Sequence, residues 1–437
     1  MNVVRPTEKA LSVSMQVVLD ANFTQPTGLA MIIDSCPRFV QRFLASSCSQ
    51  LSRPQRVHLW RLVLAIATTS GAAKLSRLAA MVKDGRHRTR LGGFLRDSDW
   101  DASAMLAERA MATLRWMKPR RGETIELLID DTRVVKRGKQ MDCLQKIWDH
   151  KHKGYARGHI WVFAALRFRG VVLPWRIVLW KPKRDAGVAF RKITQIGADL
   201  VAELDLPWAL KVRVLFDAYY LCPPVTEACK NKGFDWLSVA SRNRTFHRDG
   251  GKKAKIGRLA PGWLKHMART VRMPRARGSI TQRIASVDGA LSRIGRVRLV
   301  AAKRPRDAWG NMVVFVTNRK WDARKIVSLY ERRWDIEVMF KHLRTDLGLG
   351  DYQMLDEQGF VRHLHLCALA HLLLTHHAME GVGAQARKAT EKVALPAMSI
   401  RQETLRTAIR RDQVKRLVGG SDHRKLRMKL EPYLMAA

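Results

Sequence analysis

The sequence predicts an α/β protein in which a mixed β-sheet is flanked by helices, with further helices at both ends of the chain. Three observations predict this class. Apolar residues recur at helical spacing before residue 121, strand-like runs rich in β-branched and aromatic residues begin near Glu123, and strands then alternate with helices. The chain has 437 residues and is 46% hydrophobic, which permits a large core and two or three domains.

The first predicted domain, residues 1–121, is helical. Its helices are expected over residues 53–67, 73–83 and 102–116, with Asp101 as the N-cap of the third. Residues 85–96 are expected to form a basic loop between the second and third helices. Two helices joined by a short break and followed by basic residues can read a groove of DNA. A small helical bundle with a solvated basic face explains the same pattern equally well.

Strands dominate the next segment. They are expected over residues 124–129, 159–167, 171–180, 212–216 and 236–240, with helical stretches over 185–204 and 225–230. Three strands, a helix, and then strands alternating with helices is the element order of the ribonuclease-H-like fold. We therefore expect a ribonuclease-H-like catalytic domain over residues 122–350.

Two further segments are unusually basic. Residues 242–310 hold 19 Lys and Arg against 3 Asp and Glu, together with Gly and Pro turns and the expected strands 297–302 and 312–316. This pattern favours an inserted subdomain that covers nucleic acid. In the C-terminal region, residues 351–437, the stretch 387–430 has 13 basic and 4 acidic residues. Basic amphipathic helices that contact DNA or a second subunit are expected there.

The net charge of the whole chain indicates a polyanionic partner. There are 80 Lys and Arg against 38 Asp and Glu, which gives a formal charge of +42. The longest apolar stretch, residues 364–378, is interrupted by four histidines, so no membrane span is expected. Residues 1–22 lack the pattern of a secretory signal. Six cysteines without a Cys-x-x-Cys pair fit a reduced compartment, and a cytoplasmic location is expected.

Acidic residues stand at the expected ends of two strands. Asp130 and Asp131 follow the strand 124–129, and Asp217 follows the strand 212–216. Carboxylates at the ends of neighbouring buried strands converge on one edge of a sheet, where they need partners. Successive residues of a strand face opposite ways, so only one of Asp130 and Asp131 can point into a shared site. For any one of these residues alone, a turn or a helix cap is the simpler interpretation.

A third carboxylate lies in residues 330–344, which are expected to form one helix. Tyr330, Arg333, Glu337, Lys341 and Arg344 share one face of this helix, beside an apolar stripe formed by Leu329, Ile336, Phe340, Leu343 and Leu347. Glu337 would complete a set of three hard oxygen ligands with Asp130 and Asp217. Such a set suits two ions of Mg²⁺ or Mn²⁺, and the flanking cations suit phosphates.

The spacing Tyr-x2-Arg-x3-Glu-x6-Lys resembles the signature of bacterial insertion-sequence transposases of the DDE class, with Arg344 in place of the family's Lys. The resemblance implies that Asp130, Asp217 and Glu337 are the catalytic metal ligands. Asp130 is chosen over Asp131 because the family pattern Asp-x-Thr matches Asp130 with Thr132. The implied DNA contacts are Tyr330, Arg333, Trp334, Lys341 and Arg344.

The same resemblance implies a reaction and an assembly. The reaction is metal-dependent nicking at the ends of an element in double-stranded DNA, followed by attack of the freed 3′-hydroxyl on target DNA. The N-terminal helical domain would bind the element ends, and a homodimer would act on paired ends. In some members an insertion Trp stacks on a flipped base, for which Trp263 and Trp309 are candidates.

Two other functions keep part of this pattern. A domesticated transposase that only binds DNA would explain the charge, and a structure-specific nuclease of the same fold would keep the carboxylates. Two smaller His clusters are expected to be packing or surface residues instead of metal ligands. These clusters are the stripe His363, Cys367 and His371 and the group Asp149, His150 and His152.

Overall fold

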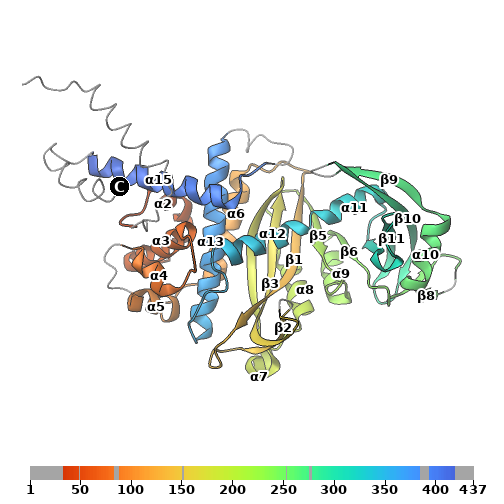
Figure 1. Cartoon of the computed structure of the whole chain (residues 1–437), viewed down its shortest axis with the longest axis horizontal. Coiled ribbons are helices and arrows are strands. Elements are labelled where there is room, and N and C mark those ends of the chain that lie inside the picture. Colours follow the sequence, from red (N-terminus) through yellow and green to blue (C-terminus); the bar gives the residue numbers. More distant parts are fainter. Residues whose placement is uncertain are drawn as a thin grey trace, which may run out of the picture.

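A computed structural model of the chain describes residues 33–48, 50–82, 88–149, 152–251, 253–274, 278–383 and 393–418. It has a 12-stranded mixed sheet. Helices pack on this sheet (Figure 1). This arrangement confirms the predicted ribonuclease-H-like α/β class. The first 32 residues lie outside the described part, as do residues 83–87 and the last 19 residues.

Five strands form the centre of the sheet. These are β1 (Thr124–Lys136), β3 (Gly154–Phe168), β4 (Val171–Trp180), β5 (Lys211–Phe216) and β6 (Asp235–Val239). β3 pairs with β1 and β4 in antiparallel fashion, while β5 lies parallel to both β1 and β6. Three antiparallel strands followed by two parallel ones is the ribonuclease-H-like order. A short strand, β2 (Gln145–Asp149), pairs with the outer end of β3.

The first strand is longer than the sequence predicts. The prediction ended it at residue 129, but β1 continues through Asp130 to Lys136 and stays paired with β3 throughout. The residues after Ile129 alternate between faces of the sheet, with Thr132 and Val134 buried and Arg133 and Val135 exposed. That alternation is typical of a strand with one covered face, and the sequence-based prediction missed it.

Different helices cover the two faces of the central strands. The predicted helical stretch 185–204 becomes the short α7 (Lys183–Ala186) and then α8 (Ile193–Glu203). α8 packs beside α9 (Pro223–Asn231) and approaches the sheet so closely that a Cβ at Gly197 would lie 2.7 Å from the Tyr220 ring and 3.7 Å from Ile129. The face that carries Asp130 is therefore the other one, where α12 (Trp334–Lys341) contacts β1.

The basic segment after β6 extends the same sheet. Its elements are β7 (Thr245–Arg248), β8 (Lys253–Lys255), α10 (Ile256–His266), β9 (Arg269–Pro274), β10 (Ser279–Leu291) and β11 (Gly295–Lys303). β12 (Val313–Thr317) pairs with β6 on one side and with β11 on the other, so the hydrogen-bonded ladder is continuous. Figure 1 shows these strands at the end of the sheet opposite the N-terminal helices.

The N-terminal and C-terminal helices pack around one long helix, α13 (Glu357–Val382). The others are α2 (Arg38–Leu44), α3 (Arg53–Thr68), α4 (Leu75–Ala80), α5 (Arg88–Arg96), α6 (Ala102–Trp116) and α15 (Met398–Val418). α13 contacts α3, α5, α6, α15 and β4. Asp101 caps α6 as predicted, because its carboxylate accepts from the N–H of Ala104 at 2.9 Å.

The basic loop expected over residues 85–96 is wrong where the structure describes it. Residues 88–96 form α5, whose Leu91, Phe94 and Leu95 are buried at helical spacing against the other helices. Residues 85–87 lie outside the described residues. The predicted helical stretch 387–430 is described only from residue 393 to 418, and this part contains the whole of α15.

The single helix expected over residues 330–344 is also wrong. α11 (Ala323–Glu331) ends at the second residue of this range, α12 begins at Trp334, and a π-helical turn follows at His342–Asp346. Between α11 and α12 the backbone forms the tighter hydrogen bonds of a 3-10 helix. Here each donating N–H bonds to the carbonyl oxygen three residues earlier, and the donors are Arg332, Arg333, Asp335 and Ile336. The predicted apolar stripe is nevertheless buried as a whole. No helix among the described residues is long and apolar enough to cross a membrane.

Candidate active site

The parallel pairing of β1 with β5 brings two of the predicted carboxylates together. Ile129 lies opposite Phe216 in this register, so Asp130 of β1 lies beside Asp217, the residue that follows β5. The Asp217 carboxylate is close enough for its charge to contribute to the raised pKa of Asp130. The convergence expected from the sequence is therefore present, although Asp130 lies within its strand and not at its end.

Arg333 connects Glu337 to this pair. Its guanidinium donates to Asp130 Oδ2 at 2.7 Å and to Glu337 Oε1 at 2.5 Å. The side chains of Arg333 and Asp130 are only 13% and 15% exposed, so this contact is shielded from solvent. The tight turn before α12 places Arg333 directly over β1. The sequence placed Arg333 beside Glu337 on one helix face, but it gave no indication that the guanidinium contacts Asp130.

Burial and neighbouring charges perturb the groups around this pair. Burial, with smaller contributions from the Asp217 and Asp131 charges, raises the pKa of Asp130 to about 7, although the Arg333 cation opposes this shift. Burial also raises the pKa of Tyr330 to about 12. The Tyr330 ring packs on Phe315, with centroids 5.3 Å apart, and the Arg333 guanidinium lies over it at 5.6 Å. Perturbed carboxyl groups of this kind are typical of functional sites.

Asp131 occupies the other face of β1. Its carboxylate accepts from the Tyr220 hydroxyl at 3.5 Å, and burial raises its pKa. Asp217 also serves as a turn residue, since its Oδ1 accepts from the N–H groups of Tyr219 and Tyr220 at 2.9 and 3.3 Å. Asp131 therefore accepts a hydrogen bond from a neighbouring side chain, and Asp217 stabilises a turn. Among the two neighbouring residues of β1, Asp130 alone contacts Arg333.

The three carboxylates have the chemistry of a divalent metal site. Asp130, Asp217 and Glu337 supply hard oxygen donors, which suit Mg²⁺ and Mn²⁺. In this conformation Arg333 lies between Asp130 and Glu337. Among the described residues, no group of three His, Cys, Asp or Glu side chains is already gathered closely enough to hold an ion. A cation between these carboxylates is nevertheless what their mutual repulsion requires, and the Arg333 guanidinium meets that need here.

The predicted DNA-contacting residues differ in their surroundings. Trp334 is 61% exposed at the start of α12, and Lys341 is exposed at its end. Arg344 donates to the Thr132 hydroxyl, two residues along β1 from Asp130. The Asp-x-Thr segment of β1 (residues 130–132) thus contacts residues 330–344, the signature segment, at two points. Arg333 binds Asp130, and Arg344 binds Thr132. The structure brings Arg333, Glu337 and Arg344 to β1 and leaves Trp334 and Lys341 facing outward.

A buried ion network next to the site was missed by sequence reasoning. Its centre is Glu126, whose side chain is 3% exposed, and its cations are Arg167, Arg213 and Arg332, whose nitrogens lie 2.6, 3.2 and 2.6 Å from the Glu126 oxygens. Arg167 also binds Asp335 at 2.6 Å. Glu126 and Asp130 lie on the same face of β1, and consecutive arginines of the α11–α12 turn bind them. The available signal was a charged residue inside an otherwise apolar strand.

Other candidates from the sequence have structural surroundings. Trp263 is 6% exposed and packs edge-on against Phe246, so it is a core residue and not a base-stacking one. Trp309 is 51% exposed, with the Lys303 ammonium 5.3 Å from its ring. His363 and Cys367 are fully buried in α13, with His363 Nε2 3.2 Å from the Gly348 carbonyl oxygen. His152 pairs with Asp149 at 2.6 Å, while His150 lies outside the described residues.

Comparison with known proteins agrees with this geometry. The chain matches the family described as Transposase DDE domain over residues 122–373, which is more than half of its length. The matched segment contains Asp130, Asp217, Glu337 and every element of the central sheet. No curated protein matches the chain. The match over most of the chain, together with a ribonuclease-H-like sheet, shows that the chain belongs to the Transposase DDE domain family.

Proposed function

We propose that this protein is a DNA transposase that cleaves double-stranded DNA at the ends of an insertion sequence and joins the freed ends to target DNA. The observation that carries this proposal is the approach of Asp130 of β1 to Asp217, which follows the adjacent strand β5, with Glu337 joined to Asp130 through Arg333. Membership of the transposase family and the charge of +42 support DNA as the substrate.

Asp130, Asp217 and Glu337 are the residues that would hold two divalent ions, Mg²⁺ or Mn²⁺. When bound, such ions supply activation of an attacking hydroxyl and stabilisation of the leaving oxygen at phosphorus. The cations of the signature segment would bind the phosphates beside the scissile bond. Of these, Lys341 and Arg344 are free of carboxylate contacts in the described structure, whereas Arg333 binds two carboxylates. Arg333 would therefore order the carboxylates as well as the DNA.

The remaining parts of the chain would handle DNA away from the chemistry. Residues 1–121 would bind the element ends, residues 122–350 would form the catalytic domain, and residues 242–310 would cover the DNA as an insertion. Trp309, exposed beside Lys303, is the candidate in this insertion for stacking on a flipped base. Residues 351–437 would contact DNA or a second copy, since cleavage of two paired ends requires at least a homodimer.

The test uses a supercoiled plasmid that carries the DNA flanking the gene on both sides. We expect the wild-type protein with Mg²⁺ to cleave at the element ends and to produce joined products. Asp130→Asn, Asp217→Asn and Glu337→Gln should each abolish cleavage but keep binding to the ends, because phosphate contacts rest on Lys and Arg. Full activity in all three variants would end the enzyme proposal. Cleavage without any joining would identify a nuclease instead.

The choice of Asp130 over Asp131 has its own test in the same assay. Asp131→Asn should keep substantial cleavage, because Asp131 faces Tyr220 on the other side of β1. Normal cleavage by Asp130→Asn together with loss in Asp131→Asn would show that the assignment of this pair is reversed.

A further inference from the structure

One face of the β2–β3 ribbon carries two cations and two aromatic side chains. In the antiparallel register Lys146 lies opposite Arg157, and Trp148 lies opposite Tyr155. Residues two apart in a strand share a face, so all four side chains are on the same side of the ribbon. All four are exposed, with Trp148 at 40% and Tyr155 at 67%. On the other face, Gln145 and Ile147 are buried.

This arrangement is unfavourable for an isolated protein surface. Like charges directly opposite each other on paired strands are destabilising. Among the described residues, no carboxylate forms an ion pair with Lys146 or Arg157. The Trp148 and Tyr155 rings meet edge-on at 5.2 Å, and the Lys146 ammonium lies 4.2 Å from the Tyr155 ring centroid. The side chains of this face thus contact one another, but no negatively charged group among the described residues pairs with the two cations.

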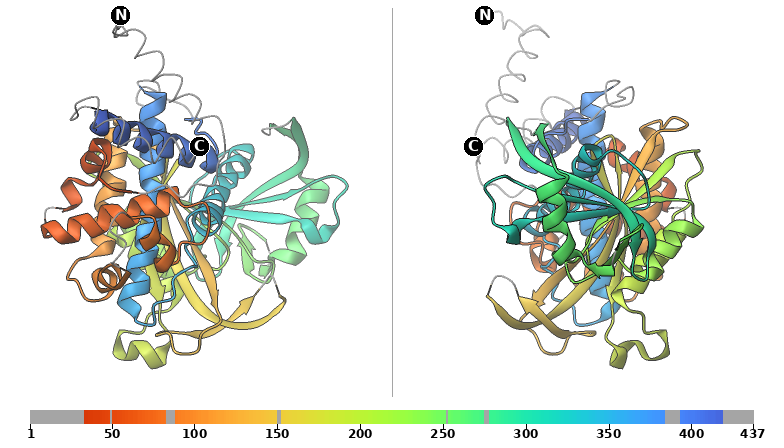
Figure 2. Two further views of the ribbon diagram at one scale, coloured as in Figure 1. Left: turned by 60° about the vertical axis from the view of Figure 1, so that its left-hand side comes forward. Right: turned by 90° about the vertical axis from the view of Figure 1, so that its right-hand side faces the viewer.

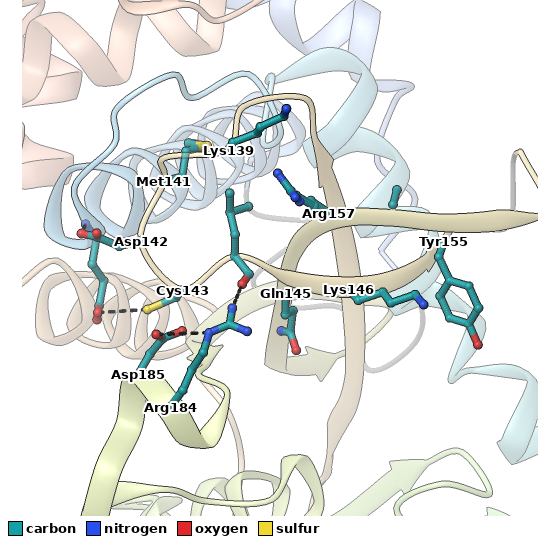
Figure 3. A pocket seen from close by; sticks show the side chains of 13 residues that line it. Lys139, Met141, Asp142, Cys143, Gln145, Lys146, Tyr155, Arg157, Arg184 and Asp185 are labelled. Atoms are coloured by element: carbon teal, nitrogen blue, oxygen red, sulfur yellow. Dashed lines mark hydrogen bonds and ion pairs between the residues drawn. The ribbon is translucent and has the colours of Figure 1, made fainter.

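A cavity of about 910 Å³ opens beside this face and adds further cations. Lys139, Lys146, Arg157 and Arg184 line it, and Figure 3 shows Lys146 beside Tyr155 at one end. The acidic residues of the cavity are already engaged. Glu357 binds Lys181 at 2.6 Å, Asp185 lies 3.5 Å from Arg184, and Asp142 accepts the N–H of Glu357 at 2.9 Å. Among the described residues, the lining cations without an ion pair are Lys139, Lys146 and Arg157, against the single carboxylate of Asp142, so the charge at this end of the sheet is positive.

The ribbon face continues the face of the sheet that holds the active site. Asp130 pairs with Phe163 of β3, and residues 155, 157, 159, 161 and 163 alternate onto one face. Phe163 contacts Phe340 of α12 on that face, with ring centroids 5.0 Å apart. Eight residues at about 3.3 Å each place Tyr155 about 26 Å from the Asp130 level. That span corresponds to about eight base pairs of duplex at about 3.4 Å each.

We infer that Lys146, Trp148, Tyr155 and Arg157 form a binding face for the double-stranded DNA that flanks the cleavage site. The two cations would contact phosphates, and the aromatic pair would pack against the sugar edges of the same strand. The inference rests on the proposed function for the identity of the DNA, but it concerns binding and not chemistry. A second copy of this chain is a poor occupant of this particular face, because the two cations here need a concentrated negative charge and the chain holds 80 basic against 38 acidic residues.

The first test is a salt titration of binding to a random-sequence duplex of about 40 base pairs. Lys146→Ala/Arg157→Ala should lower the slope of log K against log salt by about two, since each lost phosphate contact accounts for about 0.9. The matched control is Lys192→Ala/Lys230→Ala, which removes two exposed cations at the α8–α9 layer on the opposite face. Equal slopes for wild type and the ribbon variant, or equal loss in the control variant, would overturn the inference.

The second test maps the contact directly by crosslinking and keeps both cations in place. Tyr155 is replaced by the photo-crosslinking residue benzoylphenylalanine, and Lys192 is replaced in the same way as the control. Irradiation should join the protein to DNA from position 155 and not from position 192. Crosslinks from position 155 to a second protein chain would assign the face to a protein partner and refute the DNA proposal. An inactive enzyme with these crosslinks would refute the proposed chemistry and leave the binding face intact.

Discussion

The guanidinium of Arg333 binds the carboxylate of Asp130 at 2.7 Å, although the two residues are 203 positions apart in the chain. The contact joins the turn between α11 and α12 to the middle of β1. Because Arg333 also binds Glu337, it holds two of the three proposed metal ligands at once. A side chain in this position can control both the charge and the geometry of the site.

Replacing Arg333 should therefore damage cleavage more than binding. We expect Arg333→Ala to lower cleavage and strand transfer on the order of a hundredfold, because preorganised charge at a reacting phosphate is typically worth that much. Affinity for end DNA should change far less, since many phosphate contacts remain. The measurement is a gel-shift titration beside a cleavage time course, with the exposed Lys320→Ala as the control. Loss of both properties in equal proportion would contradict the role.

The raised pKa of Asp130 predicts that metal binding depends on pH. A carboxyl with a pKa of about 7 is largely protonated in mildly acidic solution, and the proton competes with Mg²⁺. The rise in melting temperature on adding Mg²⁺ should be large at about pH 8 and small at about pH 6. Asp130→Asn should show little rise at either pH. A rise that is equal at both pH values in the wild type would argue against this carboxyl as a ligand.

In the absence of metal, the raised pKa of Asp130 also determines how the free energy of unfolding changes with pH. The folded-state pKa of Asp130 lies above its ordinary value of 3.8, so the folded protein binds more protons between these values. The resulting contribution to stability is present below about pH 4 and is lost as the pH rises through about 7. Urea unfolding in EDTA should show this fall for the wild type relative to Asp130→Asn.

How far the sequence predicted the site depends on the range of each interaction. Helical spacing identified the buried stripe from Leu329 to Leu347, because that pattern depends on neighbours along the chain. The break of the helix at Arg332 and Arg333 was not predictable in this way. It accompanies contacts to Glu126 and Asp130, which are more than 200 residues away. The extension of β1 past Ile129 likewise depends on its pairing with β3.

The network around Glu126 supplies a stability prediction. Glu126→Ala would leave the buried Arg167 and Arg213, and the partly exposed Arg332, without the carboxylate that they share. Removing one partner of a buried ion pair costs about 3–5 kcal/mol, so the free energy of unfolding should fall by that order. Urea unfolding measures it, with the exposed Glu227→Ala as the control. An equal and small effect of both substitutions would show that the network does not stabilise the fold.

Substitutions at Arg344, which contacts Thr132, can distinguish the effect of its positive charge from the effect of its guanidinium geometry. Arg344 stands where the family has Lys, and its guanidinium donates to the Thr132 hydroxyl on the strand that carries Asp130. If its role is to hold a phosphate beside the scissile bond, Arg344→Ala should lower cleavage on the order of a hundredfold with little loss of binding. Arg344→Lys keeps the charge and should retain substantial activity.

Thr132→Val tests the alternative that Arg344 only fastens the π-helical turn to β1. This substitution removes the hydroxyl and keeps the shape of the side chain. Because the phosphate contact needs the cation and not the hydroxyl, Thr132→Val should reduce cleavage much less than Arg344→Ala. The cleavage time course and gel shift on the same end substrate give the comparison. If Thr132→Val and Arg344→Ala reduce cleavage equally, and the double variant is no worse than either, then Arg344 acts through Thr132 and does not contact the DNA itself.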